Sequence, residues 1–344
     1  MIRFILLPIL VLLTVGLLPL RPQNLRPPHE ILEHALYLAD LYNWDDAGND
    51  FAEAEKRFVA AGDQRNALYA KLGKIRSTVD QRAFPATSAQ LASDLEDNPL
   101  LQTDKQLRLF CLIVKGDIDG EIDAGAMRED WQEVQDLARE LGNEKWQYRA
   151  LAQLGVAAFY DGDLATAGKN VATALAAATK YGDVGAQVRF LTSLGIGLRE
   201  ARMSEEALTY FHKALRIANT IPEIGYPFLT KEALLECLID AKRVESAQKL
   251  ADEILAQAHQ RHRLQAEAIV LTLEAHMATQ RHDDAAALQT LQKSMALSEP
   301  GGFVMQLLDA LQRFESLDRR FQARSRLSNS HQNGNSKPSI ASAV

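Results

Sequence analysis

The sequence predicts an all-α protein, an α-solenoid of antiparallel helix pairs, and three observations support that fold class. Aromatic residues make up only 7% of the chain while alanine and leucine are plentiful, and these two residues lose little side-chain entropy in helices. Apolar residues recur at helical spacing within single segments. The whole pattern then returns with a period of about forty residues, which is typical of a repeat array.

The clearest repeat lies in residues 205–215, where Ala207, Phe211 and Ala214 fall on one face of a helix. The same offsets are apolar in the segments about forty residues before and after it. They are filled by Ala167, Val171 and Ala174 upstream, and by Ala247, Ala251 and Ile254 downstream; a further forty residues on they are Ala287, Leu291 and the polar Ser294. The pattern weakens toward the start of the chain, so we expect degenerate repeats there.

Residues that stop helices recur with the same period. Glycine just past a helix end can adopt the left-handed conformation that other residues resist. In one unit we expect a first helix from Trp146 to Tyr160, a turn at Asp161–Asp163 and a second helix to about Lys180. Neither helix can bury its apolar stripe alone, so neighbouring pairs are expected to stack. The residues that are expected to end helices at this spacing are Gly62, Gly142, Gly182, Pro222 and Gly302.

These units resemble the tetratricopeptide repeat, most clearly over residues 148–220. The resemblance rests on Leu154–Gly155 and Leu194–Gly195 together with small residues such as Ala167. The usual tetratricopeptide period is about 34 residues, so longer helices are expected here. HEAT-type repeats also have periods near forty, but the small residues favour the tetratricopeptide interpretation. The segment Leu288–Phe303 is similar to the sensor repeats of MalT-like bacterial regulators.

The run Phe4–Leu20 near the amino terminus is uncharged and lies between Arg3 and Arg21. Its length is at the lower edge of the roughly 17–25 residues that cross a bilayer as a helix. A cleaved signal peptide is the rival interpretation, although no small-x-small cleavage site follows the run. A buried helix is the third. We therefore expect an N-terminal hydrophobic helix that contacts the membrane through residues 4–20.

The domain organisation follows from these patterns. Because the tail before the hydrophobic run is very short, we expect a membrane-anchored chain whose repeat body is extracytoplasmic. The expected segments are a membrane anchor or signal segment (1–22), a proline-rich linker (23–28), degenerate helical repeats (29–147), tetratricopeptide-like repeats (148–300), a capping helix (301–324) and a disordered tail (325–344).

Two segments resemble metal-binding motifs, but the spacing of their residues does not match those motifs. His29–His34 reads H-E-x-x-x-H, one residue longer than the zinc-binding H-E-x-x-H, which places the second histidine on another helix face. Asp117–Asp123 resembles part of a calcium loop, but Lys115 and Ala126 stand where its first and last ligands belong. We expect no enzyme, cofactor or metal. The net charge of −7 gives no basic excess for nucleic acid.

The tetratricopeptide resemblance implies a concave groove lined by the first helix of each pair, with a protein or peptide as partner. The groove would change from basic and aromatic to acidic within about one repeat. Three interpretations stay open: the residues are solvated surface charges, Arg199 and Glu236 pair across units and hold the stack, or the polarised groove binds a segment of complementary charge. The candidate residues are Arg149, Phe159, Tyr160, Arg189, Arg199, Glu232, Glu236 and Asp240.

The function expected from these features is that of an interaction scaffold, either tethered to the membrane or exported, that mediates protein–protein contact. The alternative is a ligand- or peptide-sensing repeat domain of a bacterial signalling system, which the MalT-like segment suggests. The sequence does not identify the partner in either case.

Overall fold

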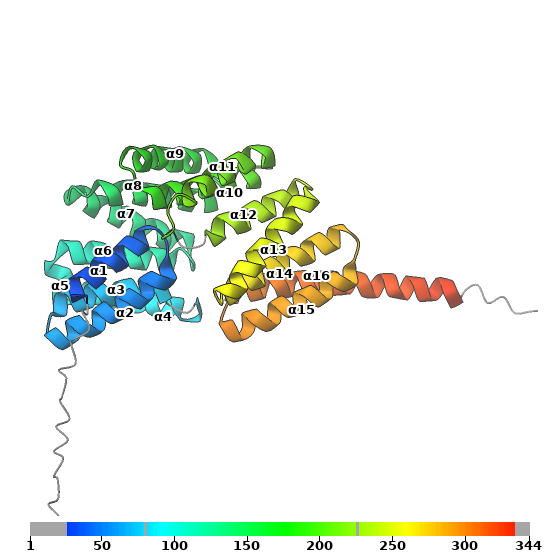
Figure 1. Cartoon of the computed structure of the whole chain (residues 1–344), viewed down its shortest axis with the longest axis horizontal. Coiled ribbons are helices and arrows are strands. Elements are labelled where there is room, and N and C mark those ends of the chain that lie inside the picture. Colours follow the sequence, from blue (N-terminus) through cyan, green and yellow to red (C-terminus); the bar gives the residue numbers. More distant parts are fainter. Residues whose placement is uncertain (1–25, 79–80, 225–226, 334–344) are drawn as a thin grey trace, which may run out of the picture.

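The computed structural model describes residues 26–78, 81–224 and 227–333, and these residues form α-helices apart from turns and one short 3₁₀ helix. Consecutive helices pack antiparallel and stack side by side, sweeping from α1 through α8 to α15 (Figure 1). The predicted α-solenoid of helix pairs is therefore confirmed. The predicted N-terminal hydrophobic helix lies outside the described residues.

The middle of the chain contains the most regular pairs, where the predicted helix bounds agree with the structure to within a few residues. The residues before several helices, such as Asn143, Asp163 and Asp183, accept a hydrogen bond from a backbone N–H in the first turn. These caps satisfy donors that a helix start leaves unpaired. The helices are α8 (Glu144–Tyr160), α9 (Leu164–Lys180), α10 (Val184–Glu200) and α11 (Ser204–Ala218).

The forty-residue period is made of two halves of about twenty residues, each a helix and a short turn. A residue with positive φ follows most of these helices, and glycine fills only some of the positions. Tyr42, Arg202, Lys242, His262 and His282 take the others, so the twenty-residue spacing continues where glycine is absent. Pro222 falls on the same spacing without a left-handed backbone, because its ring fixes a negative φ.

The chain departs from this regularity between α11 and α12 (Phe228–Asp240). A connection longer than the other turns separates them, and α12 has 13 residues where α10 has 17. Within the connection, Ile224 is buried in a cluster with Val188 of α10 and Leu41. The array then resumes with α13 (Val244–Gln260), α14 (Leu264–Gln280), α15 (Asp284–Gly301) and α16 (Val304–Asn333).

The first part of the chain, where degenerate repeats were expected, is helical but less regular. A short helix interrupts the alternation of long ones, and η1 (Gln81–Ala83) precedes α4. The core here is rich in leucine and includes Trp131, which is 1% exposed. The helices are α1 (Pro28–Asp40), α2 (Trp44–Ala61), α3 (Gln64–Thr78), α4 (Phe84–Asp97), α5 (Pro99–Thr103), α6 (Lys105–Asp119) and α7 (Ala124–Glu140).

Close approach of the two helices in a pair depends on glycine. A Cβ placed on Gly195 of α10 would lie 2.6 Å from a ring carbon of Phe211 of α11. Gly155 meets Val171 in the same way at 2.8 Å, one repeat earlier. In both units, therefore, an apolar side chain of the second helix packs directly on a glycine of the first helix.

The C-terminal helix is longer than predicted. A capping helix over residues 301–324 was expected, and α16 begins at Val304 and continues to Asn333. Ala310 and Leu317 of α16 are buried against α15, which fits the capping role. Residues 325–333 of the expected disordered tail are helical, and its remaining residues lie outside the described part of the chain.

The localisation prediction requires a correction. Among the residues that the structure describes, no helix is both long and apolar enough to cross a bilayer. The segment expected to form the anchor, residues 1–22, lies outside those residues, as does most of the predicted linker. A membrane-anchored, extracytoplasmic body is therefore not retained.

Candidate functional site

Adjoining hollows are lined by first helices of successive pairs, among them α3, α6, α8, α10, α12 and α14, and we call them together the central channel. We name two of its hollows. The α12 hollow, of about 260 Å³, lies between α10, α12, α14 and the turn that joins α1 to α2. The α8 hollow, of about 710 Å³, lies between α3, α6, α8 and the start of α16. Arg189 lines both hollows.

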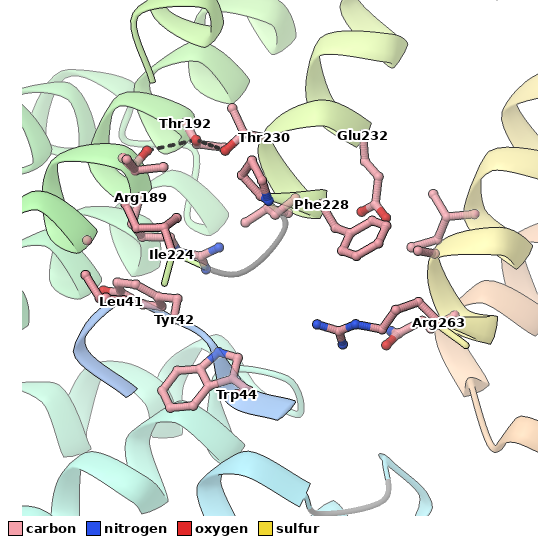
Figure 2. A pocket seen from close by; sticks show the side chains of 17 residues that line it. Leu41, Tyr42, Trp44, Arg189, Thr192, Ile224, Phe228, Thr230, Glu232 and Arg263 are labelled. Carbon is pink, nitrogen blue, oxygen red and sulfur yellow. Dashed lines mark hydrogen bonds between the residues drawn. The ribbon is translucent and has the colours of Figure 1, made fainter. Parts of the chain in front are cut away.

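The α12 hollow combines aromatic rings with charges (Figure 2). Tyr42 and Trp44 come from the α1–α2 turn, and Phe228 comes from the start of α12. At its back wall the hydroxyls of Thr192 and Thr230 share a buried hydrogen bond of 2.8 Å, which joins α10 to α12. The hollow is therefore a built cavity with fixed walls on at least two sides.

Arg189 is a half-buried cation at the junction of the two hollows. No described residue forms a hydrogen bond or ion pair with its guanidinium. Burial raises the pKa of the Glu121 carboxyl across the channel, and the charge of Arg189 acts in the lowering direction. Arg189 is thus available to an acidic group that enters the channel.

Glu232 is the opposite charge in the α12 hollow. Burial raises the pKa of its carboxyl to about 7, although the nearby charge of Arg263 acts in the lowering direction. Within the described part of the chain, no group donates a hydrogen bond to this carboxylate. Sequence reasoning placed both Glu232 and Arg189 in the groove, and both line the hollow.

Arg149 does not lie open in the channel, although it occupies the same repeat position as Arg189. Its side chain is 3% exposed and makes a bidentate ion pair with Asp183, with two N–O distances of 2.9 Å. It also lies 3.3 Å from a carboxylate oxygen of Asp40 at the end of α1. The hydroxyl of Tyr148 donates to Asp183 from the same cluster. Arg149 is therefore part of the interior.

The three remaining charged candidates form ion pairs between neighbouring helix pairs. Arg199 of α10 forms an ion pair with Glu236 of α12, and its Nε lies 3.7 Å from a carboxylate oxygen of Asp240. The structure thus contains the cross-unit pair that the structural interpretation of these charges expected. The pair is partly exposed, with side-chain exposures of 16% for Arg199 and 39% for Glu236, so its contribution to stability is small, roughly 0–1 kcal/mol.

The two aromatic candidates lie at the end of α8. Tyr160 is exposed and lines the α8 hollow. The ring of Phe159 lies against it, with 6.1 Å between the ring centroids. An exposed ring beside a hollow offers apolar contact area to a ligand.

Sequence reasoning missed the α1–α2 turn, which reaches across the channel. Asp45 lies 2.8 Å from Nε of Arg263 at the start of α14, and Asn43 donates to the carbonyl of Glu223. A Cβ on Gly185 would lie 2.1 Å from the carbonyl oxygen of Asp40, so only glycine permits this approach. No local sequence signal reports contacts over such separations.

Among the described residues, no group of three or more histidine, cysteine, aspartate or glutamate side chains is arranged to hold a metal ion. The two cysteines, Cys111 and Cys237, are buried as free thiols. Burial raises the pKa of the Cys111 thiol to about 12, so it is unreactive at neutral pH. The chemistry that the channel offers is binding through charge and aromatic surface.

No known family model matches the sequence, and no curated protein does. Similar solved structures include a Rap protein complexed with competence and sporulation factor, with a TM-score of 0.51 and 11% identity over 86% of this chain and 76% of that one. Another is a signal-transduction ATPase with a tetratricopeptide repeat sensor from Pyrococcus horikoshii, with a TM-score of 0.50, 16% identity and coverage of 83% and 44%.

These likenesses concern the fold, because the identities are low. Together with the helix pairs they show a tetratricopeptide-like helical-repeat protein. The chain spans less than half the length of the ATPase. The similarity of Leu288–Phe303 to MalT-like sensor repeats is not confirmed and stays a prediction.

Proposed function

We propose that this chain is a protein-interaction scaffold whose central channel binds an extended peptide segment of a partner protein. The observation that carries the proposal is that two half-buried charged side chains, Arg189 and Glu232, line one hollow and have no ion-pair or hydrogen-bond partner among the described residues. Keeping such charges without a partner costs free energy, and a ligand of complementary charge offsets that cost. The similar Rap structure, solved with a bound factor, supports a binding role for this fold.

The shape of the channel favours a segment of chain over a compact metabolite. A compact ligand usually fills a single pocket of about 300–1,000 Å³, whereas here two hollows, of about 260 and 710 Å³, adjoin each other. They meet at Arg189, so one extended ligand can occupy both. Tyr160 at the far end adds an exposed ring to the same path.

Exchanging Arg189 for glutamate should weaken this binding at least tenfold, about 1.4 kcal/mol, because the new charge repels the acidic group that the arginine would attract. The measurement is capture of random heptapeptides by the immobilised protein, followed by calorimetry with the peptides recovered. The matched control is Arg216→Glu, since Arg216 is exposed on the outer helix α11. Equal affinity of both variants and the wild type, with circular dichroism unchanged, removes the channel as the binding site.

A second function, sensing, is favoured by the contact that the α1–α2 turn makes across the channel. A ligand in the α12 hollow would lie beside the ion pair of Asp45 and Arg263, which joins the α1–α2 turn to α14. Opening or closing of this contact and binding of the ligand can therefore influence each other. Binding would then change the curvature of the solenoid.

Replacing Asp45 with alanine should change peptide affinity several-fold if closure and binding are coupled, because the variant shifts the balance between open and closed forms. Calorimetry measures the affinity, and small-angle X-ray scattering measures the change of shape on binding. Glu33→Ala is the control, since Glu33 is exposed on α1. An affinity unaffected by Asp45→Ala, with no change of shape, favours a static scaffold.

A further inference from the structure

We propose that the peptide held in the channel carries a basic and an acidic side chain close together, the basic one bound by Glu232 and the acidic one by Arg189. This inference rests on the proposed function, because the ligand is the segment that occupies the channel. It adds the chemical class of that segment and assigns each charge to one protein side chain.

The first step is the direction of Glu232. Figure 2 shows its side chain extending from α12 into the hollow, with the carboxylate beside the ring of Phe228. Tyr42 and Trp44 lie across the hollow from it. A guanidinium or ammonium group that enters here would meet a carboxylate and aromatic rings, the combination that recognises organic cations in proteins.

The rings of this region already contact guanidinium groups. Arg76 lies over Trp44, with 4.6 Å from its central carbon to the ring centroid, and Arg263 lies over Phe228 at 5.3 Å. These arginines already cover ring faces of Trp44 and Phe228, so a cation from a ligand would be held mainly by the carboxylate of Glu232.

The second step is the charge balance around Glu232. Arg263 of α14 is paired with Asp45, and Glu236 on the same helix as Glu232 is paired with Arg199. Asp309 of α16 is likewise paired with Arg313 of its own helix. The charged or titratable groups that line the hollow with Glu232, or the hollow beside it, are Tyr42, Arg189, Arg263, Glu236 and Asp309.

The remaining pair of unmatched charges, Glu232 and Arg189, therefore defines the ligand. A segment with a single charge would leave one of the two unpaired. A segment with both charges would satisfy each of them and would gain in specificity, because the reversed order of charges would place like charges together.

The affinity of the channel for the basic side chain of the ligand should depend on pH, and the direction of this dependence follows from the titration of Glu232. The pKa of Glu232 is about 7 in the empty channel, so the carboxyl is neutral in acid and ionised above pH 7. A cation binds the ionised form, and binding therefore releases a proton when the pH is near 7. Affinity for the basic side chain should fall as the pH is lowered from 8 to 6.

The test uses four pools of heptapeptides, randomised among uncharged residues, with two fixed positions. The first pool fixes arginine and glutamate, the second arginine and glutamine, and the third glutamine and glutamate. The fourth, uncharged pool has glutamine at both positions. We expect the wild-type protein to retain the arginine–glutamate pool at least tenfold better than the uncharged pool.

Glu232→Gln should remove the preference for arginine and its dependence on pH, and keep the preference for glutamate. Arg189→Gln should do the reverse.

The outcomes separate the two proposals. Retention of all four pools to the same extent supports channel binding but overturns the charge assignment. Retention of none of the pools overturns both. Loss of both preferences in Glu232→Gln, with circular dichroism and melting temperature unchanged, also contradicts the assignment of one charge to each residue. Both glutamine variants keep the size of the native side chain or reduce it, so the fold is expected to remain intact.

Discussion

Replacing Arg149 with methionine should lower the free energy of unfolding by about 3–5 kcal/mol, as expected when one partner of a buried ion pair is removed. The variant leaves Asp183, whose side chain is 10% exposed, without its bidentate partner, and removes a contact to Asp40. Urea denaturation followed by circular dichroism measures the change. Arg216→Met, on the outer face of α11, is the control and should change stability by less than about 0.5 kcal/mol.

The effect of Arg149→Met should depend on pH in a stated direction. Burial raises the pKa of Asp183, but the hydrogen bonds from Arg149 and Tyr148 and the charge of Arg149 outweigh it and leave that pKa below its usual value. A lowered carboxyl pKa contributes stability that is present above about pH 4 and is lost as the pH falls through the folded-state value. The gap between variant and wild type should therefore narrow in acid. A constant gap from pH 7 to pH 3 contradicts this account of the cluster.

Introducing a single methyl group at Gly195 should destabilise the protein by about 1–3 kcal/mol through overpacking. The added Cβ would lie 2.6 Å from the ring of Phe211, which is itself fully buried and cannot move away. Thermal unfolding of Gly195→Ala, followed by circular dichroism, measures the loss.

The same helix supplies the matched control for Gly195→Ala. Gly197 of α10 has nothing within 4 Å of an added Cβ, and its backbone is helical. Gly197→Ala should therefore be neutral or stabilising by up to about 1 kcal/mol, because alanine is the better helix former. Equal behaviour of the two variants would mean that α10 and α11 do not approach each other as described.

Much of the fold could be predicted because its signals are local. Apolar spacing within a helix, a capping side chain before it and a left-handed residue after it are all readable within about twenty residues. Positions such as Phe211 and Val171, which the repeat placed in the core, are 0% and 4% exposed. The turn between the two helices of a pair was predicted at Asp161–Asp163, where Gly162 marks it, whereas Arg202 and similar residues adopt the same backbone conformation without that signal.

The site was predictable only in part, and two residues show why. Arg149 and Arg189 occupy the same position in successive repeats, so sequence reasoning assigned both to the groove. Arg149 is buried because the end of α1, with Asp40, packs over it, whereas Arg189 faces the hollows. The difference arises from a contact between residues far apart in the chain, and the repeat pattern carries no information about it.

The contact of the α1–α2 turn with the middle of the array changes how the protein is expected to fold. Units of an ordinary solenoid contact only their neighbours, so folding can begin anywhere and spread along the chain. Here Asp40 reaches Arg149 and Asp45 reaches Arg263, so closing these contacts requires ordering a long stretch of chain first. The start of the chain and its middle should consequently gain and lose structure as one cooperative block, with a slower folding rate than a helical array of purely local contacts.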